Sequence, residues 1–266
     1  MDNKQIDRLN YLVDEFIADS DSYKDIENPS SIEDKKRILR SLMNIRLPKK
    51  MKDEVIEVQD EYLKEIAREK GIVELSDIPV IKDNISIWQG DITRLKVGAI
   101  VNAANSMMLG CFVPMHICID NQIHTFAGIQ LRQECNDNME KLREKYGDDY
   151  RQPTSVPMLT DAYNLPADKV IHVVGPIVGS KLTESLEDDL ANCYRNILDM
   201  CLENSIKSVA FCCISTGVFN FPNKRAAEIA TETVKKWNSN NPNAMDRIIF
   251  NVFSDKDRRY YEEILL

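Results

Sequence analysis

The stretch SVAFCCIS, residues 208–215, is apolar along almost its whole length. Such a run is typical of a strand that is covered on both faces, as in a parallel sheet. Amphipathic helical patterns lie between this stretch and similar runs, for example at 186–204 and 224–237. The similar runs are NISIWQG (84–90), GAIVNA (98–103), KVIHVVG (169–175) and RIIFNVF (247–253). This alternation predicts an α/β fold of three layers, α/β/α, around a largely parallel mixed sheet.

The first 80 residues have a different pattern, which predicts helices and no strand. Ser31 is expected to cap a second helix that stops at 47–48, and a third helix over 53–70 is expected to end at Gly71. The first helix is expected to bury one apolar face, formed by Ile6, Leu9, Val13 and Phe16. We therefore predict a helical N-terminal extension, residues 1–80, packed on a main domain, residues 81–266.

Composition limits the classes of function. The formal net charge of the 266 residues is −9, with acidic and basic residues intermixed, which argues against a nucleic-acid-binding surface. No apolar run is long enough to span a membrane, and the N-terminus does not resemble a signal peptide. The seven cysteines do not form the pattern of a disulfide framework, so we expect a reducing, cytoplasmic location.

Two motifs follow predicted strands. ISTGVFNFP (214–222) follows a strand expected to end near Cys213, and GCFVPMHICID (110–120) follows one expected to end near Val101. In open α/β sheets ligands bind beyond the carboxyl ends of the strands, so both loops are expected to face one crevice. The Ser-Thr-Gly sequence suits a pyrophosphate, because its hydroxyls and backbone N–H groups can donate to phosphate oxygens. An ordinary turn is the simpler alternative.

Two further motifs carry polar side chains at predicted strand ends. In VNAANS, Asn102 and Asn105 could hold ribose hydroxyls or a water, or could cap the local backbone. In GDIT, Asp91 could accept a hydrogen bond from an exocyclic amine such as that of adenine, or could form an Asx-turn.

The stretch 110–120 contains the spacing Cys-x4-His-x-Cys, formed by Cys111, His116 and Cys118. Two sulfur ligands and an imidazole favour zinc, and a set of three protein ligands is typical of catalytic rather than structural zinc sites. A cysteine nucleophile with a histidine base is a second interpretation, although it leaves the second cysteine unexplained. A helix entry that merely contains cysteine is a third.

Five motifs together resemble the macrodomain family, whose α/β/α fold binds ADP-ribose. They are GDIT (90–93), AIVNAANS (99–106), IDNQIHTFAG (119–128), YNLPADKVIHVVGP (163–176) and ISTGVFNFP (214–222). Where most members carry a run of glycines, this chain has MLGCFVPMHIC, which resembles the zinc-containing microbial macrodomains that remove ADP-ribose from proteins.

The resemblance implies a role for each matching residue. Cys111, His116 and Cys118 would bind one Zn²⁺ per chain. Asp91 and Ile92 would contact adenine, and Asn105 and Asp120 would contact the distal ribose as the catalytic residues. Cys118 and Ile119 would line the same loop as the metal. The diphosphate and its ribose would be wrapped by Ser215, Thr216, Gly217, Val218 and Phe219.

The implied function is a zinc-dependent hydrolase that removes mono-ADP-ribose from modified protein side chains. It would cleave the bond at the anomeric carbon of the distal ribose and release ADP-ribose, with no nucleic-acid or membrane partner. A reader that binds ADP-ribose without cleaving it, and a hydrolase of a free ester such as O-acetyl-ADP-ribose, are the alternatives. Val218 stands where some zinc-containing members carry an acid.

The other two histidines are interpreted separately. His124 follows Asp120 by one helical turn, where it could either support the carboxylate or simply pack within the helix. His172 lies within the apolar run VIHVV and is expected to be a hydrogen-bonded core residue.

Overall fold

The main sheet of the computed structural model, which describes residues 1–266, has six strands in the order β2-β8-β7-β4-β6-β5. Neighbouring strands from β2 to β6 are parallel, and only the edge strand β5 runs antiparallel to β6. The strands are β2 (Ile85–Gln89), β4 (Ala99–Ala104), β5 (Met158–Asp161), β6 (Lys169–Val174), β7 (Ser208–Phe211) and β8 (Arg247–Val252). The predicted largely parallel sheet is therefore confirmed, although strand β5 was not predicted.

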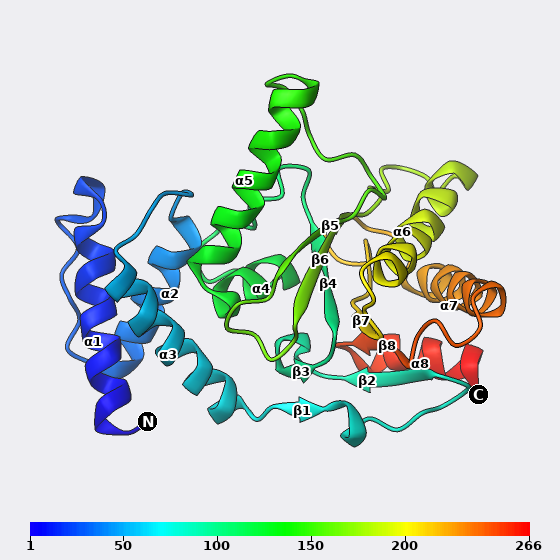
Figure 1. Cartoon of the computed structure of the whole chain (residues 1–266), viewed down its shortest axis with the longest axis horizontal. Coiled ribbons are helices and arrows are strands. Elements are labelled where there is room, and N and C mark those ends of the chain that lie inside the picture. Colours follow the sequence, from blue (N-terminus) through cyan, green and yellow to red (C-terminus); the bar gives the residue numbers. More distant parts are fainter.

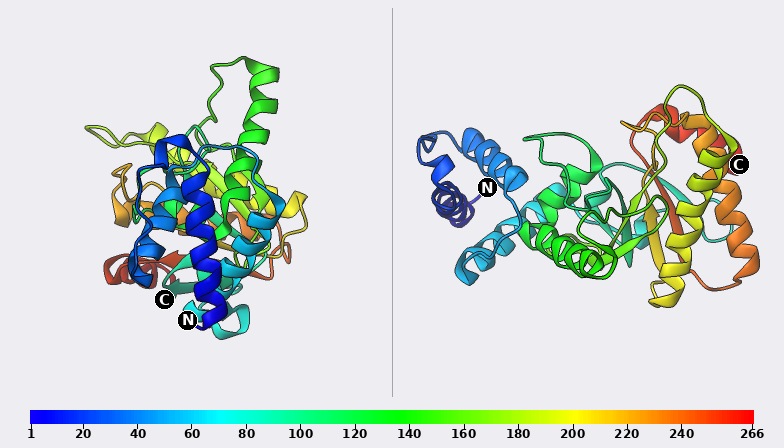
Figure 2. Two further views of the ribbon diagram at one scale, coloured as in Figure 1. Left: turned by 90° about the vertical axis from the view of Figure 1, so that its left-hand side faces the viewer. Right: turned by 90° about the horizontal axis from the view of Figure 1, so that it is seen from above.

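Helices cover both faces of this sheet (Figure 1). On one side lie α4 (Ile119–Ala127) and α5 (Ile129–Tyr146). On the other lie α6 (Glu184–Glu203), α7 (Asn223–Asn240) and α8 (Asp255–Leu265), as the view from above also shows (Figure 2). The strands β4, β6, β7 and β8 are almost wholly buried between these layers. This double burial explains why their sequences are apolar without alternation.

The N-terminal helices form a further layer beside α4. They are α1 (Asn3–Ala18), α2 (Ile32–Ile45) and α3 (Asp53–Lys70). Their apolar faces meet in a cluster of their own, to which Ile129 of α5 also belongs. Ser31 caps α2 by accepting a hydrogen bond from the Asp34 N–H, and Gly71 ends α3 with a positive φ of 82°, both as predicted. The division into two parts at residue 80 stays a prediction.

Short elements connect the extension to the sheet. A two-residue strand β1 (Val73–Glu74) pairs in parallel with β3 (Leu95–Lys96), so the expectation of no strand before residue 80 was wrong by this one short pairing. The sequence VE is too short to show a strand pattern of its own. Three single 3₁₀ turns complete the chain: η1 (Asp21–Tyr23), η2 (Leu75–Asp77) and η3 (Ile92–Arg94).

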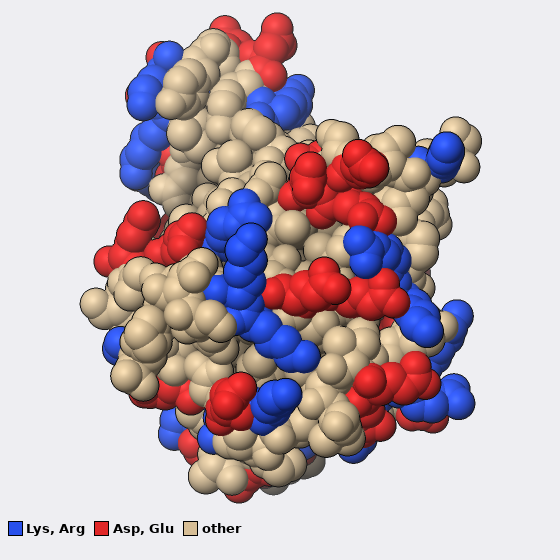
Figure 3. Space-filling view, turned by 90° about the vertical axis from the view of Figure 1, so that its right-hand side faces the viewer, with Lys and Arg blue, Asp and Glu red and all other residues tan.

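The surface agrees with the intermixed charges of the sequence. On the face seen in Figure 3, basic and acidic side chains alternate and neither sign forms a continuous field. All seven cysteines are free thiols. No helix combines the length with the apolar character that a membrane crossing requires.

Candidate functional site

The predicted site loops meet at the carboxyl edge of the sheet. Because β4 and β7 are parallel neighbours, the loops that leave their carboxyl ends start side by side. The loop after β4 carries residues 105–118, and the loop after β7 carries residues 212–222. β4 ends at Ala104 rather than near Val101, and β7 ends at Phe211 rather than near Cys213. The expected common crevice is consistent with this topology.

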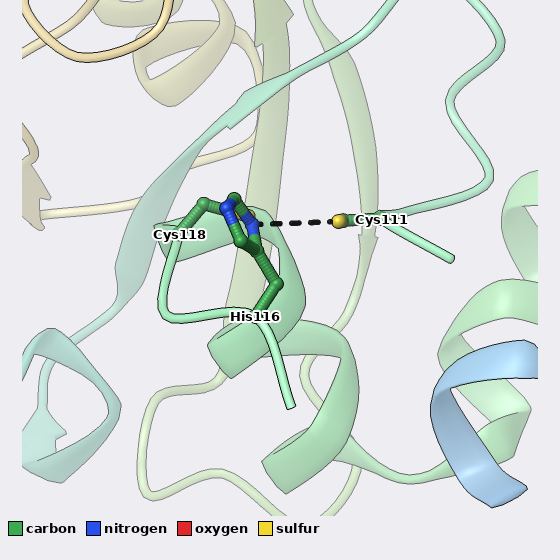
Figure 4. Close-up of side chains that lie close together, drawn as sticks. All are labelled: Cys111, His116 and Cys118. Carbon is green, nitrogen blue, oxygen red and sulfur yellow. Dashed lines mark hydrogen bonds between the residues drawn. The ribbon is translucent and has the colours of Figure 1, made fainter. Parts of the chain in front are cut away.

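The three predicted metal ligands lie together in the loop before α4 (Figure 4). The ligand atoms of Cys111, His116 and Cys118 are all within 4.8 Å of one another, and Cys111 Sγ is 3.6 Å from His116 Nδ1. Tetrahedral zinc with ordinary Zn–S and Zn–N bonds places its sulfur and nitrogen ligands about 3.5 Å apart. The cluster is half-buried. Its donor set and spacing therefore fit a zinc ion.

Local hydrogen bonds fix the start of α4 at this cluster. Cys118 is the N-cap residue of α4, and its Sγ accepts a hydrogen bond of 3.4 Å from the Asn121 N–H. The Asn121 side chain is buried, and its Nδ2 donates to the carbonyl oxygens of Val113 and Cys111 at 3.0 and 3.4 Å. Asn121 thus holds the loop against the helix. Our sequence analysis missed it, although it directly follows Asp120 in a recognised motif.

The pKa of the Cys118 thiol argues against the alternative of a cysteine nucleophile. Burial raises the pKa of Cys118 to about 11, with further contributions from the nearby Cys111 and Asp120. A nucleophilic cysteine requires the opposite shift, since the thiolate is the reactive form.

Asp120, predicted to contact the distal ribose, lies almost wholly buried beneath the loop. Its Oδ1 accepts a hydrogen bond of 2.8 Å from Asn102 Nδ2, and its Oδ2 a longer one of 3.5 Å from Asn105 Nδ2. Burial raises the pKa of Asp120 to about 6, against the opposing effects of the Asn102 hydrogen bond and the Arg132 charge. The two asparagines of VNAANS therefore both point to the carboxylate.

Asn105 is also a turn residue. Its Oδ1 accepts a hydrogen bond of 2.9 Å from the Met107 N–H, and its Nδ2 donates to the Gly110 carbonyl at 3.2 Å. Asn105 can therefore cap the local backbone and contact Asp120 at the same time, because its Oδ1 accepts from the backbone while its Nδ2 donates to both Gly110 and Asp120. Asn105 is only partly buried, so it lies between Asp120 and the surface.

The loop after β7 presents free donors. The N–H groups of Gly217, Val218 and Phe219 have no acceptor within the protein. Consecutive unpaired N–H groups at a strand end are suited to bind an anion such as a diphosphate. The chain turns into this loop at Ser215, whose φ of 64° is left-handed, and Thr216 Oγ1 donates to the Cys213 carbonyl at 2.9 Å.

Ser215 packs against β6 through a glycine. Its buried Oγ has no hydrogen-bond partner. A Cβ added at Gly175, the residue after β6, would lie 2.1 Å from that oxygen. Only glycine at 175 therefore leaves room for the Ser215 side chain in its observed position. The strand motif containing Gly175 was recognised from the sequence, but this packing role was not.

Asp91 and Ile92 follow the carboxyl end of β2. Asp91 Oδ1 accepts hydrogen bonds from the Thr93 N–H and Oγ1 at 3.0 and 2.6 Å, so the simpler Asx-turn interpretation describes the observed geometry. Its Oδ2 is 2.5 Å from Lys70 Nζ at the end of α3. Burial alone would raise the pKa of Asp91, but the hydrogen bonds from Lys70 and Thr93 outweigh burial and lower it. Ile92 is buried.

The remaining histidines form a buried cluster with Cys135. The ligand atoms of His124, Cys135 and His172 lie within 4.8 Å of one another. His172 nevertheless has both ring nitrogens engaged, with Asn102 Nδ2 3.0 Å from Nδ1 and Thr160 Oγ1 3.0 Å from Nε2. This agrees with a hydrogen-bonded core histidine.

His124 has no hydrogen-bond partner on either ring nitrogen. Its Nε2 is 3.6 Å from Asp120 Oδ1, and its ring packs beneath Gly110, where an added Cβ would approach the ring to 2.8 Å. Burial lowers the pKa of His124 well below its ordinary value. The ring is therefore neutral and packed, which favours the simpler of its two interpretations.

Comparison with known proteins identifies this arrangement. The Macro domain family matches residues 101–230. A protein of Treponema medium named protein-ADP-ribose hydrolase is 44% identical over 265 residues, covering 98% of this chain and 99% of its own length. A protein of the same name from Staphylococcus aureus (strain MSSA476) is 42% identical and covers 96% of this chain and 94% of its own length.

A solved structure shows the same fold. The crystal structure of a Trypanosoma brucei macrodomain in complex with ADP-ribose superposes with a TM-score of 0.64 at 29% sequence identity. The match covers 85% of this chain and 95% of that one. From the sheet, its strand-end loops and these full-length relatives, we conclude that this chain belongs to the macro domain family.

Proposed function

We propose that the chain is a zinc-dependent hydrolase that removes mono-ADP-ribose from modified protein side chains. The names of the full-length relatives support hydrolysis of protein-ADP-ribose. Support for the zinc requirement comes from the cluster of Cys111, His116 and Cys118 beside Asp120. Seven free cysteines support a reducing, cytoplasmic location.

The order of the loops along the sheet edge carries the proposal. Asp91 follows β2, the free N–H groups of 217–219 follow β7, and Asn105 follows β4, in the strand order β2-β8-β7-β4. Three strand spacings correspond to about 14 Å. ADP-ribose has its adenine, its diphosphate and its distal ribose in the same order. An extended ADP-ribose across this edge would bring its distal ribose to Asn105, Asp120 and the metal cluster.

The chain's own residues have three tasks in the reaction. Hydrolysis replaces the bond between the anomeric carbon and the acceptor atom by a bond to a water oxygen, and a water proton passes to the acceptor. The N–H groups of Gly217, Val218 and Phe219 would hold the diphosphate, which contributes binding energy remote from the reacting carbon. Asn105 and Asp120 would orient the distal ribose as its anomeric carbon gains oxocarbenium character. Asn102 keeps Asp120 in place.

The metal site has a clear set of ligands. Cys111, His116 and Cys118 would hold one zinc ion, and a set of three protein ligands matches catalytic rather than structural sites. When bound there, zinc supplies Lewis-acid chemistry beside the distal ribose. Val218, exposed on the diphosphate loop, brings no carboxylate to this chemistry.

A zinc-exchange experiment tests the proposal. A mono-ADP-ribosylated protein is incubated with the purified enzyme, with chelator-stripped enzyme, and with stripped enzyme given zinc again. Released ADP-ribose is followed in all three, and folding is checked by circular dichroism. We expect release to disappear on stripping and to return with zinc. Full activity of the stripped enzyme would contradict the zinc requirement.

The same assay separates the alternatives. A reader would bind ADP-ribose but release none from any modified protein, whether or not zinc is present. A hydrolase of free esters would cleave O-acetyl-ADP-ribose and leave the modified protein intact. Cys118→Ser is expected to abolish release while ADP-ribose binding is retained, because the diphosphate loop lies on a different strand end.

A further inference from the structure

The loop that carries the metal ligands has little hydrogen bonding of its own. Between Gly110 and Cys118 the backbone forms a single internal hydrogen bond, from the His116 N–H to the Val113 carbonyl at 3.2 Å. Met115 has a left-handed φ of 59°, and the Ile117 side chain is 85% exposed. Such a segment needs support from elsewhere to hold one conformation.

That support comes from α2 of the N-terminal extension. Arg40 Nη2 donates to the His116 carbonyl at 2.8 Å and to Asn121 Oδ1 at 3.0 Å. Asn44 Oδ1 accepts from the Met115 N–H at 3.0 Å, and its Nδ2 donates to Thr125 Oγ1 at 2.9 Å. Arg40 and Asn44 are one helical turn apart, so both lie on the same face of α2.

These contacts fix the backbone on both sides of His116. Asn44 holds the N–H of the preceding residue, while Arg40 holds the carbonyl of His116 itself. Arg40 also braces Asn121, which in turn binds the Cys111 and Val113 carbonyls. Asn44 and Asn121 are each at most 1% exposed, so water cannot easily replace their bonds.

We propose that Arg40 and Asn44 are positioning residues for the metal site, and that the helical extension is therefore part of the catalytic unit. The proposal rests on the proposed zinc site. Residues that orient metal ligands through hydrogen bonds alter metal affinity by about 10–100-fold when they are replaced. We expect losses of this order here, without loss of the fold.

The test measures the metal directly in the full-length chain. Zinc affinity is determined by competition with a chromophoric chelator for the wild type, Arg40→Met, Arg40→Lys and Asn44→Ala. Arg37→Met is the matched control, because Arg37 lies on the same helix but is exposed and its guanidinium has no partner. The absorption spectrum of the Co²⁺-substituted proteins reports the geometry of the thiolate ligands, and circular dichroism confirms folding.

The expected result is weaker zinc binding, by about 10–100-fold, and an altered Co²⁺ spectrum in Arg40→Met and Asn44→Ala. Arg40→Lys keeps a donor and should recover part of the affinity, and Arg37→Met should match the wild type. Wild-type affinity and spectrum in folded Arg40→Met and Asn44→Ala would overturn the proposal, and would show that α2 only attaches the extension. A wild type that binds no zinc would instead overturn the metal site itself.

Discussion

Single residues decide how closely the loops approach the sheet. Gly175 permits Ser215 to pack where no Cβ could be accommodated, and Asn102 connects His172 on the next strand to Asp120 on α4. The chemistry of the site thus depends on side chains inside the core as well as on those at its surface. Two predictions belong to this scale.

Gly175→Ala should weaken ADP-ribose binding. The added methyl group would lie 2.1 Å from Ser215 Oγ and 2.8 Å from Ile214 Cγ2, so these side chains at the start of the proposed diphosphate loop must move. Overpacking of this kind costs about 1–3 kcal/mol, which corresponds to a loss of affinity of about 5- to 150-fold if it falls on the bound state. Isothermal titration calorimetry measures the affinity. Gly179→Ala is the control, because its Cβ would meet nothing within 4 Å; equal affinity in both variants would contradict the packing argument.

The unfolding free energy should fall in mild acid because His172 is buried in its neutral form. Burial lowers its pKa to about 3, below its ordinary value of about 6.5, so the unfolded chain binds an extra proton between these two values. Its contribution is therefore complete above about pH 6.5 and is lost as the pH falls towards 3. His124 and Cys135 lie beside the ring and are present in both proteins compared below.

Comparison with His172→Gln isolates this contribution. The Gln side chain can still accept a hydrogen bond but does not titrate. Between about pH 7 and about pH 5, the unfolding free energy of the wild type should fall by about 2 kcal/mol more than that of the variant. Urea denaturation at the two pH values measures the difference. Parallel losses in both proteins would show that His172 is not the group responsible.

At the scale of elements, the sequence predicted most of what lies in the core. Strands that are buried on both faces, such as 169–174, could be recognised because the positions from Val170 to Val174 are all apolar except His172. The edge strand β5 could not, because its four residues MLTD have neither the length nor the alternation of a strand. Its place is set by antiparallel pairing with β6, the next strand along the chain, and not by a pattern in its own residues.

The site was predictable to a similar degree. The proximity of Cys111, His116 and Cys118 could be predicted, because cysteine and histidine residues close in sequence at this spacing are typical of a metal site. Arg40 and Asn44 could not, since they act across 70 residues or more and nothing in α2 distinguishes them from other polar helix residues. Arg40 and Asn44 bind backbone groups of His116 and Met115, and every residue carries such groups, so the loop sequence does not indicate these contacts.

Helix α5 should lose stability when its buried arginine is replaced. Arg132 donates to the carbonyls of Leu109, Met43 and Arg46 at 2.8, 2.9 and 2.6 Å, and so joins α5 to the end of α2. Arg132→Met would leave these carbonyls without a donor and should lower the unfolding free energy by about 3 kcal/mol. Urea denaturation followed by circular dichroism tests this. Lys141→Met, on the exposed face of α5, should change little; a similar loss in both variants would argue against the hydrogen bonds.

At the scale of the whole molecule, the helical extension packs directly against the domain that contains the sheet. The apolar cluster of α1–α3 includes Ile129 of α5, and Lys70 at the end of α3 pairs with Asp91 after β2. The extension therefore reaches the site from two directions, through α2 and through α3. The sequence could indicate that helices precede the sheet, but their placement depends on polar contacts that no periodicity records.

The strand order also bears on how this protein can be shortened for study. The segment 101–230 matched by the family omits β8, which pairs with β7 in the sheet, and β2, which pairs with β8. An expression fragment trimmed to those limits would leave β7 as an unprotected edge, which invites pairing between chains and aggregation. It would also retain the three proposed metal ligands but not α2, whose Arg40 and Asn44 contact their loop. If such a fragment were insoluble or bound no zinc, the cause would be the missing strands and helix. The result would not test the proposed metal site of the full-length chain.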